Sequence, residues 1–140
     1  MTLDKILSIT GKPGLFNLIS HAKGHLVVES LEDGKRFPVA GAHQVNTLEN
    51  IAIYTYTKEV PLAEVFYSIF LKAEGSETIS HTENNAKLLD YFSEILPDYD
   101  TDRVYASNVK KIILWYNLLV KAKFDFTTLA PKESDASISE

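Results

Sequence analysis

The sequence predicts an α+β protein: a small antiparallel β-barrel followed by a helical subdomain of about three helices. Two observations support this prediction. Before residue 58, short runs of β-forming residues alternate with turns that contain Gly or Pro. After residue 58, apolar residues recur at spacings of three and four, which is the period of an amphipathic helix. Four or five short strands in fewer than 60 residues favour a small barrel.

Length and composition fit one domain or two very small ones. The chain has 140 residues, of which 45% are hydrophobic and 24% are charged, as in ordinary globular proteins. Because there is no cysteine, disulfides and thiolate metal sites are excluded. No stretch approaches the ~20 apolar residues of a membrane span, and the N-terminus lacks the features of a signal peptide. We therefore expect a cytoplasmic protein of bacterial type, without a membrane segment.

Tight turns separate the predicted strands. A Lys-Pro-Gly run at residues 12–14 precedes one strand, and an Asp-Gly pair at residues 33–34, a strong hairpin signal, precedes another. Pro38 places that second strand at an edge of the sheet or near the strand's end. In chain order, strands are expected at residues 6–9, 15–19, 25–31, 35–39 and 51–57, the last of which alternates with period two.

Three helices are expected in the second half of the chain. Pro61 suits the first turn of the first helix, and Gly75 ends it. Pro97 ends the second helix. Ser107 or Asn108 can cap the third helix.

The third helix is expected at the centre of its subdomain, because its apolar residues occupy more than one face. We therefore expect Trp115 to be largely buried, near Phe66, Ile112 and Leu119. Residues 127–140 are mostly polar and have little apolar surface to bury, so they are expected to form a disordered tail.

Several sequence motifs resemble a family of uncharacterised proteins from Bacteroidetes. The motifs are KILSI at 5–9, GKPGLF at 11–16, VESLEDGKRFP at 28–38, EVPL at 59–62 and PDYDTDRVY at 97–105. The likeness covers about residues 3–126. It implies an SH3-like barrel over residues 1–58 and a helical subdomain over residues 59–126. It implies no activity, so no residue inherits a role from it.

The charge distribution disfavours binding to nucleic acid. The net charge is −5, and all of this excess lies in residues 61–140, because residues 1–60 hold six basic and six acidic residues. A nucleic-acid-binding protein normally shows positive charge or a basic stripe. A neutral domain can still hold a local basic face, so nucleic-acid association stays open as an alternative. Its candidate residues on the barrel and the third helix are Lys12, Lys23, Lys35, Arg36, Lys110 and Lys111.

The sequence contains no convincing motif for a metal, a cofactor or catalysis. His21 and His25 have the spacing of a helical metal pair but flank a predicted β-turn. The three aspartates in residues 98–102 have the spacing of a calcium loop, but the Gly and Glu that such a loop needs are missing. They are better explained as turn residues, with Arg103 as an ion-pair partner. We expect no metal, no cofactor and no enzymatic activity; an unrecognised hydrolase is the remaining enzyme alternative.

The aromatic residues favour a binding role. The chain has seven Tyr, seven Phe and one Trp, and such rings are enriched at protein interfaces. Grooves lined by aromatic side chains bind extended peptides. We therefore interpret the protein as a non-enzymatic binding or adaptor module for an unknown protein partner, with Phe37, Tyr54 and Tyr56 as candidate contact residues.

Overall fold

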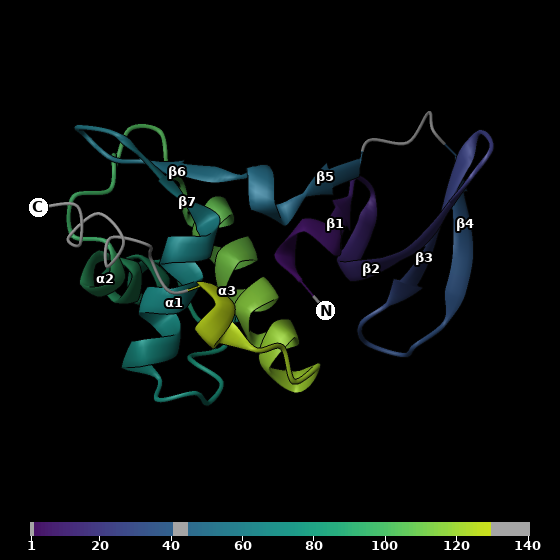
Figure 1. Ribbon diagram of the computed structural model, residues 1–140. Coiled ribbons are helices and arrows are strands. Elements are labelled where there is room, and N and C mark those ends of the chain that lie inside the picture. The colour runs from purple at the N-terminus through teal and green to yellow at the C-terminus, as the bar shows by residue number, and fades with distance from the viewer. Residues whose placement is uncertain (1, 41–44, 130–140) are drawn as a thin grey trace, which may run out of the picture.

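An antiparallel sheet of five strands forms the first part of the molecule (Figure 1). The computed structural model describes residues 2–40 and 45–129. The strands are β1 (Ile6–Ile9), β2 (Lys12–Ala22), β3 (His25–Ser30), β4 (Arg36–Ala40) and β5 (Val45–Thr47). Their order across the sheet is β4-β3-β2-β1-β5. The first four strands therefore form a meander, and β5 returns to pair with β1 at the opposite edge.

The sheet is bulged but open. Its register shifts between Leu7 and Ile9 in β1 and between Leu18 and Ser20 in β2, and such irregularities bend a strand. In the described residues no ladder joins β4 to β5, so the predicted closed barrel is not found. The structural reason is that β5 has three residues and pairs with β1. The chain then passes through a 3-10 helix, η2 (Leu48–Asn50), to the helical part of the molecule.

The two faces of the sheet belong to two separate cores. Alternate residues of a strand point to opposite faces. Ile6 and Leu15 belong to the main core, which they share with the helices, whereas Leu7 and Phe16 belong to a second cluster. The other buried members of that cluster are Ile9, Val28 and Val39. One face of the sheet therefore packs against the helical part of the molecule, and the other face carries a small apolar cluster of its own.

A short hairpin connects the sheet to the helices. It consists of β6 (Ala52–Tyr54) and β7 (Glu59–Pro61). The strand predicted at residues 51–57 is therefore shorter than expected, and it pairs with β7 instead of joining the main sheet. The physical reason is a turn: the Thr55 hydroxyl donates to the carbonyl oxygen of Lys58 (2.7 Å) and accepts from its amide (3.0 Å).

The three predicted helices are confirmed. They are α1 (Leu62–Lys72), α2 (Asn85–Ile95) and α3 (Ala106–Lys121). Pro61 is the residue that caps α1 and lies just outside it. The N-cap of α3 is Tyr105, so Ser107 and Asn108, the predicted caps, lie inside the helix. The side-chain oxygen of Asn108 accepts the amide of Tyr105 (2.8 Å).

The chain begins and ends in short 3-10 helices within the described residues. These are η1 (Leu3–Lys5) and η3 (Phe126–Leu129). Phe126 is buried, with its ring 4.9 Å from that of Tyr116 and 5.3 Å from that of Phe70. The first residues of the predicted tail, 127–129, therefore belong to η3, and residues 130–140 lie outside the described part. No described helix is long and apolar enough to cross a membrane.

Candidate functional site

Two adjoining cavities lie along one side of α3. The first cavity has a volume of about 230 Å³ and lies between α3 and β6. The second cavity has a volume of about 610 Å³ and lies between α3 and the turn that joins β1 to β2. Both are lined by Ile51, Lys111 and Trp115, so the two cavities are adjacent, and together we call them the junction groove. The groove exists only because the sheet, the hairpin and α3 meet there.

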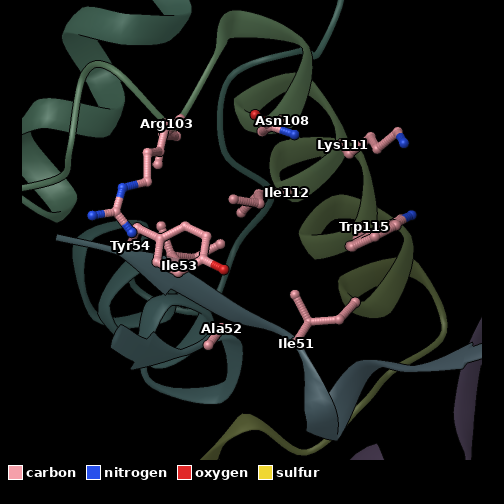
Figure 2. Close-up of a pocket in the computed structure, with 10 residues that line it drawn as sticks. Ile51, Ala52, Ile53, Tyr54, Arg103, Asn108, Lys111, Ile112 and Trp115 are labelled. Carbon is pink, nitrogen blue, oxygen red and sulfur yellow. The ribbon is translucent and has the colours of Figure 1, made fainter. Parts of the chain in front are cut away.

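The first cavity is mostly apolar. Figure 2 shows Ile112 of α3 pointing toward Ile53 and Tyr54 of β6. Its other lining residues are Ile51, Ala52, Arg103, Val104, Asn108, Lys111 and Trp115. Because Ile53, Val104 and Ile112 are buried members of the main core, the floor of this cavity is the outer edge of that core.

The second cavity has more polar residues in its lining than the first. It is lined by Ser8, Ile9, Thr10, Gly11, Lys12 and Gly14 of the first two strands and their turn, and by Asn46, Ile51, Lys111, Leu114 and Trp115. Neither cavity is lined by an aspartate or a glutamate. The junction groove therefore carries positive charge on a chain whose net charge is −5.

The α3 wall of the groove presents three hydrogen-bond donors. Asn108, Lys111 and Trp115 follow one another on a single face of the helix, and their nitrogen atoms lie on the same side of it in Figure 2. The oxygen of the Asn108 side chain is already used by the Tyr105 amide. Within the described residues, the Asn108 amide nitrogen, the Lys111 ammonium and the Trp115 indole nitrogen have no hydrogen-bond or ion-pair partner.

Trp115 is less buried than expected. It packs against the main core on one side but is only partly buried, because its other side lines both cavities. The adjacent residue, Tyr116, is fully buried instead. Trp115 is therefore the functional candidate that the sequence reasoning missed, because a position on an amphipathic helix does not show where a neighbouring domain leaves a gap.

Arg103 lines the first cavity of the groove, near the β6–β7 hairpin. Its guanidinium carbon lies 4.9 Å from the centre of the Tyr54 ring, and its Nε lies 3.1 Å from a carboxylate oxygen of Asp100. Asp100 is buried, and it also accepts the amide of Asp102 (2.9 Å). This confirms that the aspartates at residues 98–102 form a turn with Arg103 as an ion-pair partner.

The three predicted partner-binding rings do not form one surface. Phe37 lies on β4, where it packs edge-on against Phe16 with ring centres 5.5 Å apart. Tyr54 and Tyr56 are exposed on the β6–β7 hairpin, and the Tyr56 hydroxyl lies 2.8 Å from that of Thr101. Tyr54 is the one of the three that lines the groove.

The structure brings two of the six predicted basic residues together. Lys12 and Lys111 both line the second cavity, and the Lys12 ammonium lies 5.2 Å from the centre of the Phe37 ring. Arg36 pairs with Glu29 at 3.1 Å. The remaining residues, which line neither cavity, are Lys23, Lys35 and Lys110.

The described residues show no constellation typical of a metal site or of acid–base catalysis. No group of three His, Asp or Glu among residues 2–40 and 45–129 lies close enough to hold a metal ion. His21 pairs with Leu26 and His25 pairs with Ala22, so the two histidines point to opposite faces of the sheet. Burial and then the nearby Tyr91 raise the pKa of Tyr116 to about 12, but Tyr116 does not line the groove.

Two family models match the two parts of this α+β chain. Residues 3–48 match "Domain of unknown function (DUF5606)", and residues 51–119 match "Domain of unknown function (DUF6852)". The two residues between the matches, 49 and 50, lie in η2, next to Ile51 of the junction groove. No curated protein matches the chain.

A solved structure shows the same arrangement in a relative. The chain is similar to a protein from Bacteroides vulgatus whose structure was determined in solution by NMR. The two are 42% identical, the match covers 89% of each chain, and the TM-score is 0.69. The chain belongs to the family of that Bacteroides vulgatus protein, which agrees with the resemblance to Bacteroidetes proteins in the sequence motifs.

Proposed function

We propose that this protein is a non-enzymatic binding module that holds an extended segment of a protein partner in the junction groove. The observation that carries this proposal is the pair of Lys111 and Trp115 on α3. Both side chains line both cavities and have no polar partner within the described residues. Tryptophan is one of the residue types enriched among the side chains that contribute most to binding at protein interfaces.

The shape of the groove supports an elongated ligand. Its two cavities adjoin along α3 and together run from Arg103 at the hairpin to the β1–β2 turn. Peptide-binding grooves combine a few apolar anchors with donors that fix the direction of the chain. In the junction groove, Ile53 and Ile112 supply an apolar floor for such anchors. The donors of α3 can fix the direction of the bound chain.

The experiment is a comparison of native-lysate pull-downs with full-length bait proteins. We expect the wild-type chain to retain a protein that Trp115→Ala loses. Tyr105→Ala is the matched control, because Tyr105 is exposed and aromatic but lines neither cavity. Partners that all three baits retain equally would contradict a role of the groove.

Because Trp115 is the single tryptophan of the chain, its fluorescence reports occupancy of the groove directly. A purified partner is expected to change that emission on titration. Binding without any change in emission would place the partner elsewhere on the surface.

A second candidate function is association with single-stranded nucleic acid. Lys12 and Lys111 meet at one cavity, and Trp115 beside them offers a ring on which a base can stack. The net charge of −5 opposes it. We therefore place it second.

We further propose that the sheet is SH3-like and that the protein acts in the cytoplasm. The strand order β4-β3-β2-β1-β5, with a long bulged β2 and a small apolar cluster on one face, supports an SH3-like arrangement. A deletion series that ends before and after residue 50 tests whether the sheet folds as a unit.

A further inference from the structure

We infer that the junction groove selects an acidic partner segment that carries an apolar side chain next to its carboxylates. This inference rests on the proposed function and names the class of its ligand. Its basis is the polar chemistry of the α3 wall, which offers donors and no free acceptor. A ligand rich in acceptors is the complement of such a wall.

The donors are spaced to follow an extended chain. Asn108, Lys111 and Trp115 span seven positions of α3, which corresponds to about 10 Å along the helix axis. An extended peptide covers that distance in about three residues. Side-chain carboxylates and main-chain carbonyls of such a segment can therefore meet the three nitrogen atoms in turn.

The surrounding charges favour carboxylates over neutral acceptors. The cationic residues that line the groove are Lys12, Lys111 and Arg103, and no acidic residue lines it. Lys12 lies against Phe37, and Arg103 is paired with Asp100, so Lys111 is the cation without a partner in the described residues. Hydrogen bonds from an ammonium group to a carboxylate are among the stronger ones in proteins.

The apolar part of the ligand is expected beside Lys111. Ile53 and Ile112 form an apolar floor in the first cavity, and Figure 2 shows Ile112 pointing into it from α3. A leucine or phenylalanine side chain of the partner would cover this floor and the inner face of Trp115. A wholly acidic segment would make no contact with the apolar lining at Ile51 and Trp115, which are only partly buried, so the recognised sequence is mixed.

A peptide fits these observations better than a nucleic acid. A long polyanion would extend past the groove and meet a surface of net negative charge. Exposed acidic residues lie close in sequence to the groove lining, at Glu49 near Ile51 and at Asp102 beside Arg103. A short segment with two or three carboxylates avoids that repulsion.

The test is a selection from a phage-displayed library of random short peptides, with the full-length protein as bait. Selected peptides are then synthesised and titrated while the emission of Trp115 is recorded. We expect sequences enriched in Asp and Glu next to an apolar residue. Lys111→Glu is expected to weaken their binding about tenfold, because it removes one attraction and adds one repulsion. Lys23→Glu makes the same charge change away from both cavities and should leave the affinity unchanged.

Three other outcomes overturn the inference and are distinguishable. Selected peptides that change Trp115 emission but are neutral or basic would refute the acidic ligand and leave the proposed groove function standing. If no selected peptide changes Trp115 emission, both proposals fail. If an oligothymidine strand changes that emission more strongly than the peptides, and Lys111→Glu removes the effect, the ligand is a nucleic acid.

Discussion

Trp115 and Tyr116 are neighbours on α3 with opposite environments. Tyr116 is fully buried, and its hydroxyl donates to the carbonyl oxygen of Ser76 (2.9 Å). Trp115 is only partly buried and borders the junction groove. At the scale of single residues, this contrast separates a side chain that stabilises the fold from one that is available to a ligand.

We expect substitution of the two rings to differ in its effect on stability. Trp115→Ala should lower the free energy of unfolding by about 1–2 kcal/mol, whereas Tyr116→Ala should lower it by about 3–5 kcal/mol, the usual loss for a buried aromatic side chain. Urea unfolding followed by circular dichroism measures both. Equal losses would mean that Trp115 is a core residue, and this would weaken the binding proposal.

The hydroxyl of Tyr116 predicts a change of stability at alkaline pH. Its pKa is raised to about 12, first by burial and second by Tyr91, from about 10 in an unfolded chain. Between these values the unfolded chain releases this proton and the folded protein keeps it, so stability falls as pH rises. Below about pH 10 the full contribution is present.

Tyr116→Phe removes that titration. We therefore expect the difference in unfolding free energy between the wild type and Tyr116→Phe to shift in favour of the variant as pH rises from about 10 to 12. Denaturant midpoints at several pH values measure it. A difference that does not change with pH would show that the phenol titrates alike in both states.

At the scale of elements, α3 holds the segment between α1 and α2. The side-chain oxygen of Asn117 accepts the amide of Thr78 (2.8 Å), and its nitrogen donates to the carbonyl oxygen of Ile79 (3.0 Å). Asn117 is buried, so both partners depend on it. One side chain of α3 therefore supplies two hydrogen bonds to the backbone of this segment.

We expect Asn117→Leu to destabilise the protein by about 2 kcal/mol, because it leaves two backbone groups without their partner. Hydrogen exchange at the Thr78 amide should become faster in this variant. Asn108→Ala is the control: it removes the bond to the Tyr105 amide at the start of α3 and should leave exchange at Thr78 unchanged. If Thr78 exchanges at the wild-type rate in Asn117→Leu, α3 does not hold this segment.

Elements whose signals are local could be predicted from the sequence. The three helices and the hairpin meander of β1–β4 follow from apolar spacing and from Gly- and Pro-containing turns. The strand at residues 51–57 was predicted too long, because Thr55 bonds to Lys58 and turns the chain. The alternation of β-forming residues continues through that turn, so the pattern alone hides it.

The candidate site could be predicted only in part, since it forms at the junction of distant elements. Lys12, Lys111 and Tyr54 were candidates from the sequence, whereas the role of Trp115 was not recognised. Residues of β1, β6 and α3 are brought together by a tertiary arrangement that no local period encodes. The same reason explains why the open sheet was expected to be a closed barrel.

At the scale of the whole molecule, charge decides between the two candidate ligand classes. The chain carries −5, and residues 1–60 are neutral, so the positive groove is a local feature of an acidic protein. Long-range attraction to a polyanion requires a field that extends beyond the contact face. A protein partner requires only local complementarity.

We therefore expect the full-length protein to bind duplex DNA no more tightly than the ~100 μM typical of weak non-specific contacts at physiological salt. If phosphates nevertheless bound at Lys12 and Lys111, affinity would fall with salt at a slope of about −0.9 for each phosphate neutralised. A polarisation titration with random single-stranded and duplex oligonucleotides at two salt concentrations measures both quantities. Micromolar binding that weakens with salt, and that Lys111→Glu but not Lys23→Glu abolishes, would show that the groove overcomes the repulsion and would make nucleic acid the preferred ligand. If no such binding is found, and a partner protein changes the fluorescence of Trp115, the groove binds a protein partner.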